Sequence, residues 1–122
     1  MGPSAFGFVL AGELRPILRR TAQQLTLLGR VVDLDDFSTE WLGDPHAYQA
    51  LGSLDPLELA SIVNCLELGL GILQMALHME WEAAQSEGDR WQANARVCTV
   101  RTLLKQLRGW KRSVSWTEIG FE

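Results

Sequence analysis

Four acidic residues in the first half of the chain are the first candidates for chemistry. Asp33, Asp35 and Asp36 are followed by Glu40, and closely spaced carboxylates of this kind occur in the ligand loops of calcium sites. Such a loop requires glycine at its sixth position and a bidentate glutamate at its twelfth, whereas Ser38 stands at the sixth position here. We therefore predict no calcium site, and the sequence indicates no other metal and no cofactor.

A second candidate pairs His78 with Glu82, one helical turn further along the chain. This spacing suits two metal ligands or a general base with its orienting carboxylate. No second histidine or cysteine stands beside the pair in sequence, so a polar histidine on a helix is the better interpretation. The sequence also lacks a glycine-rich phosphate loop and a nucleophile elbow. We expect a protein without catalytic residues, unless Glu67, His78 or Asp44 converge in one pocket.

Cations near the carboxyl end form a third candidate. Positions 33–89 carry twelve acidic residues and no Lys or Arg, whereas positions 90–117 carry seven basic residues and no acid. A row of cations beside an aromatic ring can follow the phosphates of a nucleic acid, although a solvated face, or internal pairing with the acidic segment, is the commoner role. The candidate phosphate-binding residues are Arg90, Arg101, Lys105, Arg108, Lys111 and Arg112.

The spacing of apolar residues predicts helices that position these groups. We expect an all-α fold, a small helical bundle of three long helices and one short helix. The expected ranges are about 13–28, 45–51, 56–86 and 89–108, with the third as the long central helix.

Local signals mark several ends of these helices. Pro16 is expected in the first turn of the first helix, and Gly29 and Gly109 are expected to end the first and last long helices. Asp55 is expected to cap the central helix. Weak alternation of apolar and polar residues also allows short β or extended segments at the termini, formed by residues 6–10 and 117–121.

Composition indicates one soluble domain over residues 1–122, with residues 110–122 as a C-terminal tail or arm. The chain has 122 residues and a mass of 13.6 kDa, and 47% of its residues are hydrophobic. That size supports a core without metal or disulfides. Cys65 and Cys98 lie in apolar, helix-patterned segments, so we expect buried free thiols in a reducing, cytoplasmic environment.

The apolar stretch 59–79 raises the question of a membrane. Its length would permit a span, but it contains Glu67, and a carboxylate near the bilayer centre costs about 2.5–3.5 kcal/mol. We therefore predict a helix of a soluble protein and no membrane association.

The central helix is apolar around most of its circumference, and two neighbouring helices are too few to cover it. One explanation is a monomeric bundle with this helix in its core, and the other, which we prefer, is a homodimer or a contact with another subunit. Small residues every four positions would allow close approach of a partner helix, and tryptophans in the tail would anchor it. The expected interface residues are Ser61, Cys65, Gly69, Leu73, Ala76, Trp110 and Trp116.

The sequence therefore favours a non-catalytic helical interaction module, either a homodimer or a small subunit or adaptor of a larger assembly. The alternative is a nucleic-acid-associated protein, a ribonucleoprotein subunit or a regulator, that binds phosphates through the basic face of residues 90–112. The segregated charge fits both hypotheses.

Overall fold

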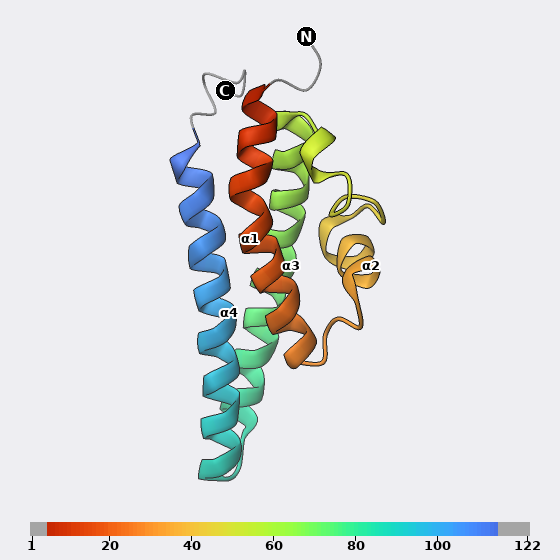
Figure 1. Cartoon of the computed structure of the whole chain (residues 1–122). Coiled ribbons are helices and arrows are strands. Elements are labelled where there is room, and N and C mark those ends of the chain that lie inside the picture. Colours follow the sequence, from red (N-terminus) through yellow and green to blue (C-terminus); the bar gives the residue numbers. More distant parts are fainter. Residues whose placement is uncertain (1–4, 115–122) are drawn as a thin grey trace.

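The fold is seen in a computed structural model of the chain, which describes the backbone of residues 5–114 and the side chains of residues 10–114. Three long helices lie alongside one another in an elongated bundle (Figure 1): α1 (Ala5–Leu27), α3 (Pro56–Ala83) and α4 (Glu87–Ser113). Helices account for all the regular structure between residues 5 and 114, and the prediction of an all-α bundle is confirmed.

The segment between α1 and α3 is folded into short turns that pack on one side of the bundle (Figure 1). Its regular parts are α2 (Leu34–Phe37), the π-helical turn η1 (Ser38–Leu42) and the 3₁₀ turn η2 (Leu51–Ser53). The expected short helix over 45–51 does not form. Residues 45–50 form turns whose backbone hydrogen bonds, from the Ala47 amide to the Asp44 carbonyl and from the Ala50 amide to the His46 carbonyl, alternate between three- and four-residue spans and build no continuous helical ladder. Gly43, with φ +85°, ends η1 in the left-handed conformation.

α1 begins earlier than predicted, and Pro16 lies in its interior rather than in its first turn. A proline inside a helix removes one amide donor and crowds the carbonyl four residues earlier, which here belongs to Gly12. Gly12 and Pro16 are both exposed, so water can reach the carbonyl that loses its helical partner. The expected strand over 6–10 is wrong, since these residues belong to α1. The expected extended segment at 117–121 lies outside the described residues.

α3 and α4 form a long antiparallel hairpin whose turn extends beyond the end of α1 (Figure 1). The Asp55 side chain accepts a hydrogen bond from the Glu58 amide and caps α3, as predicted. α4 is capped by Ser86 and runs through Gly109 to Ser113, so the expected stop at Gly109 is wrong. The continued packing of Trp110 against the core explains this, because that contact requires helical backbone beyond the glycine.

The core lies where the three long helices meet the segment between α1 and α3, residues 28–55, which we call the loop segment. Leu18, Leu70 and Leu107 are completely buried along this axis, and Phe37 enters it from α2. Cys65 and Cys98 are free thiols as predicted, but both are exposed. The two cysteines occupy positions on α3 and α4 that face away from the core, so the expectation of buried thiols is wrong.

Candidate protein-interaction face

Five large apolar side chains are exposed on one face of α3. They keep between 58% and 70% of their accessible surface, and they are Leu57, Leu68, Ile72, Met75 and Met79. Successive residues of an α-helix are rotated by about 100°, so spacings of three and four residues place Leu68, Ile72, Met75 and Met79 on one side of the helix. Leu57 precedes Leu68 by eleven residues, or about three full turns, and lies on the same side. We call these five residues the outer stripe.

The outer stripe lies on the side of α3 left open by its neighbours. Leu70 is completely buried on the opposite side. Glu67 reaches α4, while Gly69 lies under the ring of Trp41 from η1, where an added Cβ would be 3.0 Å from a ring carbon. Positions 67 and 69 are about 160° apart around the helix axis, so α4 and η1 border the outer stripe on opposite flanks.

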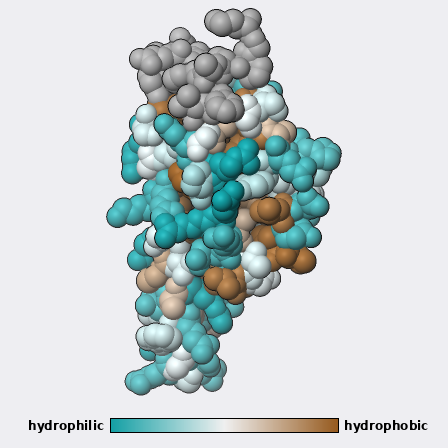
Figure 2. Space-filling view, in the orientation of Figure 1, coloured by the Kyte–Doolittle hydropathy of each residue, from teal (hydrophilic) through white to brown (hydrophobic). Residues whose placement is uncertain are grey.

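A smaller apolar patch lies on another part of the surface. Brown surface gathers around the end of α1 and α2 in Figure 2, and the exposed large apolar residues of this region are Leu27, Val32 and Leu34. These three side chains come from a helix end and a loop and do not share one helical line. The outer stripe is therefore the more regular surface for a partner helix.

The predicted interface residues fall into two groups. Ser61, Cys65 and Ala76 are exposed on α3 beside the outer stripe. Leu73 and Trp110 are each only 5% exposed and belong to the chain's own core, and Gly69 is covered by Trp41. These three are therefore not part of an open surface, because Leu73 and Trp110 pack within the core and the Trp41 ring covers Gly69. Trp116 lies outside the described residues.

Sequence reasoning missed the outer stripe itself. The polar line through Asn64, Glu67, Gln74 and His78 was the visible break in an otherwise apolar helix. In the structure Asn64 and Glu67 of this line accept hydrogen bonds from Lys111 of α4, while His78 lies against Glu82 and Trp81 of α3 itself. The spacing of four, three and four residues from Leu68 to Met79 was the signal that could have identified the stripe.

Glu67 connects the two helices of the hairpin through charged hydrogen bonds. Its carboxylate accepts bonds from Lys111 Nζ at 2.8 Å and Arg108 Nε at 2.9 Å. Lys111 Nζ also donates to the side-chain oxygen of Asn64 at 3.0 Å. The bond from Lys111, followed by that from Arg108, outweighs partial burial and lowers the pKa of Glu67 below its ordinary value. Two of the six candidate phosphate-binding cations are therefore engaged within the chain.

The other four predicted cations lie along the exposed side of α4. Arg90 lies over the Trp81 ring, with its guanidinium carbon 5.9 Å from the ring centroid. Arg101, Lys105 and Arg112 are exposed, and no salt bridge engages them within residues 10–114. These three side chains remain available to an anion.

A shallow groove joins the outer stripe to this basic side of the hairpin. It has a volume of about 310 Å³ and lies between α3 and α4, where Met75 and Met79 meet Arg101. A partner that covers the stripe would therefore also meet cationic side chains at its edge.

α3 is long and apolar enough to cross a membrane by length and composition, and 39% of its most apolar window is buried in the structure. Its partly buried Glu67 is held by two cations from α4. A core helix of a soluble protein satisfies the same length and composition test.

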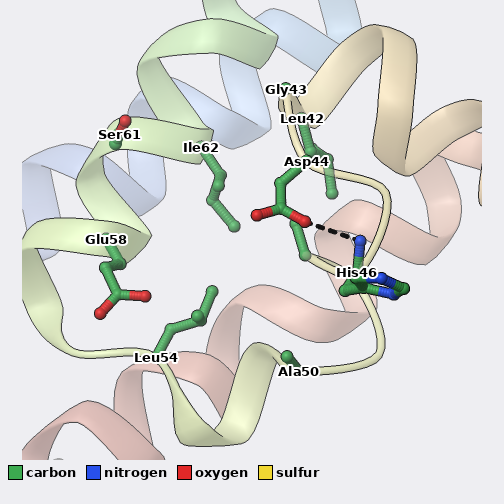
Figure 3. Close-up of a pocket in the computed structure, with 10 residues that line it drawn as sticks. Leu42, Gly43, Asp44, His46, Ala50, Leu54, Glu58, Ser61 and Ile62 are labelled. Atoms are coloured by element: carbon green, nitrogen blue, oxygen red, sulfur yellow. Dashed lines mark hydrogen bonds between the residues drawn. The ribbon is translucent and has the colours of Figure 1, made fainter.

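A separate hollow of about 260 Å³ lies between the start of α3 and the turns after η1 (Figure 3). The Asp44 and Glu58 carboxylates lie on opposite sides of this hollow, and the His46 ring points away from it (Figure 3). Lost hydration, followed by repulsion from Asp55, raises the pKa of Glu58. The hollow thus brings acidic groups near one another without a base turned toward them.

The residues whose convergence would have indicated an enzyme are dispersed. Asp44 lines the hollow of Figure 3, while Glu67 lies in the α3–α4 seam. His78 lies 3.2 Å from Glu82 and stacks on Trp81, with ring centroids 5.6 Å apart. Within the described residues, no group of three or more His, Cys, Asp or Glu side chains is placed to hold a metal ion.

Comparison with protein-family models, curated proteins and solved structures finds no match for this chain.

Proposed function

We propose that this protein is a non-catalytic helical interaction module that forms a homodimer through the outer stripe of α3. The observation that carries the proposal is the exposure of Leu68, Ile72, Met75 and Met79 at intervals of four, three and four residues. This is the spacing of the contact seam in a coiled coil, where one helix packs along another. A continuous apolar line on a water-facing helix also marks a binding surface.

The area of the outer stripe supports a reversible association. Full burial of one large aliphatic side chain contributes about 1.5–3 kcal/mol, so covering the remaining exposed surface of five such residues contributes about 5–10 kcal/mol. The loss of translational and rotational freedom on association opposes this with about 4–15 kcal/mol. Polar contacts at the edges must therefore add to the apolar contribution, and a dimer of moderate affinity is expected.

Charge at the edges supports a second copy of this chain as the partner. The outer stripe is bordered on one flank by the cations of α4 and on the other by η1, which carries Glu40 and is followed by Asp44. A two-fold axis parallel to α3 places opposite flanks against each other, so the basic edge of each copy faces the acidic edge of the other. An antiparallel arrangement would place basic against basic. The proposed dimer therefore has parallel α3 helices.

The solution mass of a matched pair of variants tests the dimer. Light scattering at concentrations up to about 100 µM is expected to give twice 13.6 kDa for the wild type. Leu68→Glu places a charge in the outer stripe and is expected to give a monomer. Leu27→Glu makes the same change at an exposed position in the smaller patch and is expected to remain dimeric. A wild type that stays monomeric throughout this range would refute the proposal.

Cysteine crosslinking tests the direction of the two helices. In a Cys65→Ser, Cys98→Ser background, Met79→Cys is expected to form a disulfide-linked dimer on oxidation, because identical residues face each other in a parallel pair. In an antiparallel pair, position 79 would face the beginning of the partner's stripe. Dimeric protein that fails to crosslink at position 79 would contradict the parallel arrangement while leaving the dimer itself intact.

Nucleic-acid binding is a second candidate function, favoured by the exposed cations Arg101, Lys105 and Arg112 on one side of α4. An interaction with phosphates releases condensed counterions, so the affinity would fall steeply with salt. Arg101→Glu with Lys105→Glu should abolish such binding while leaving the Glu67 salt bridges in place. Salt-dependent binding that is lost in this variant, together with a monomeric wild type, would favour this alternative.

A further inference from the structure

Three arginines on two successive turns of α1 line a hollow on the outer face of that helix. The hollow has a volume of about 370 Å³ and is lined by Gly12, Arg15, Pro16, Arg19, Arg20 and Gln23. None of these six residues is acidic. Hydrophilic surface covers the middle of α1 in Figure 2. The hollow is thus a concave surface with three cations and no anion.

Two of the arginines are held in place by Tyr48, a residue of the loop segment that is 7% exposed. The Arg15 guanidinium lies over the Tyr48 ring at 5.3 Å from its centroid and donates to the Tyr48 carbonyl at 3.4 Å. Arg19 Nε donates to the Tyr48 hydroxyl at 3.5 Å. The Tyr48 amide in turn donates to Ser38 Oγ, and Ser38 is buried. A buried tyrosine therefore orients two cations at the surface.

The positive charge of the cluster is not neutralised within the described part of the chain. No salt bridge engages Arg15, Arg19 or Arg20 among residues 10–114. Guanidinium groups stay charged at any physiological pH, and like charges one turn apart destabilise a helix. Such a cluster is unfavourable for the fold alone but is well suited to bind an anion.

We propose that Arg15, Arg19 and Arg20 form a binding site for a phosphomonoester group. A phosphomonoester carries nearly two negative charges at neutral pH and three acceptor oxygens, and arginine forks bind such oxygens in pairs. Tyr48 contacts Arg15 and Arg19, and Arg20, which directly follows Arg19 in the chain, adds a third cation. The hollow is larger than a phosphate, so it also accommodates part of the molecule that carries the group.

This site is independent of the proposed dimer. The hollow is lined by residues of α1 alone, whereas the outer stripe consists of α3 residues on the face opposite the buried Leu70. Both surfaces can be occupied at the same time, and failure of either proposal leaves the other standing.

Titration with inorganic phosphate at constant ionic strength tests the site. At about pH 7.5 phosphate is mainly dianionic, and saturable binding by the full chain is expected from calorimetry. The Arg20 side chain makes no hydrogen bond or salt bridge within residues 10–114. Arg20→Gln is therefore expected to retain the fold and to weaken binding about tenfold or more. Arg30→Gln makes the same charge change outside the hollow and is expected to leave the affinity within about twofold. Equal losses in the two variants, or no saturable binding, would overturn the proposal.

Two further probes identify the molecule that carries the phosphate. Glycerol 3-phosphate represents a small phosphorylated metabolite, and a short phosphoserine peptide represents a phosphorylated protein. If either probe binds more tightly than inorganic phosphate, and Arg20→Gln removes this binding, the result supports the site. The probe that binds more tightly identifies the class of molecule that carries the phosphate. If glycerol and glycerol 3-phosphate bind alike, the hollow does not recognise the phosphomonoester group and the proposal fails.

Discussion

Leu68 and Leu70 are two residues apart on α3 and offer a sharp test of both the fold and the proposed interface. Leu70 is completely buried, whereas Leu68 is 67% exposed. Leu70→Ala removes side-chain atoms from a packed core and leaves a cavity, which costs about 2.7–5 kcal/mol of unfolding free energy. Leu68→Ala removes atoms that are already mostly hydrated, so in the monomer it should cost less than about 1 kcal/mol.

Concentration separates the two roles. At protein concentrations far above the dimer dissociation constant, Leu68→Ala also removes an intermolecular contact, and its cost should rise by about 1–2 kcal/mol per subunit. The cost of Leu70→Ala should show the smaller dependence on concentration. Urea unfolding followed by circular dichroism, at concentrations that differ by about a hundredfold, measures both effects.

Either of two results would refute this reasoning. Equal costs for Leu68→Ala and Leu70→Ala at the lowest concentration would show that Leu68 is buried within the monomer. If the loss of unfolding free energy caused by Leu68→Ala does not change with protein concentration, the outer stripe does not bind a second copy of this chain. The first result contradicts the packing of α3, and the second contradicts the homodimer.

Two further predictions concern charge and capping. The pKa of Glu67 is lowered from 4.5 in the folded protein, so its stabilising contribution is complete above that value and is lost as the pH falls through the lower folded value. Glu67→Gln should therefore flatten the decline of the urea midpoint between about pH 6 and about pH 3, and an unchanged decline would show that Lys111 and Arg108 do not stabilise the carboxylate. Asp55→Ala removes the acceptor for the Glu58 amide at 2.8 Å and should lower the unfolding free energy by about 1 kcal/mol at neutral pH, measured by urea denaturation. Asp55→Asn, which keeps the acceptor oxygen, is the control and should cost much less.

The helical elements could be predicted because their signals are local. Apolar residues at helical spacing, the Asp55-Pro56 start and the left-handed Gly29, with φ +74°, depend on neighbours within about one turn. The errors occurred where distant contacts decided the outcome. The packing of Trp110 against the core extends α4 through Gly109, although a glycine there is a common local stop signal.

The candidate surface was predicted only in outline. The sequence indicated that α3 has more apolar surface than two neighbouring helices can cover, but it did not show which side remains open. Trp41, far away in the chain, covers Gly69, and the hydrogen bonds of Lys111 turn Asn64 and Glu67 toward α4. The arginines around Tyr48 were equally hidden, because Arg15 and Tyr48 are 33 positions apart.

Apolar periodicity, helix-capping residues and the distribution of charged residues are local features of the sequence. By themselves they determined that this protein is a helical bundle with an acidic middle and a basic end. Tertiary structure decided which apolar residues are covered, since burial depends on the segments that pack against a helix and not on the helix alone. For that reason Leu73 and Trp110 belong to the core, while Leu68 and Met75 remain at the surface.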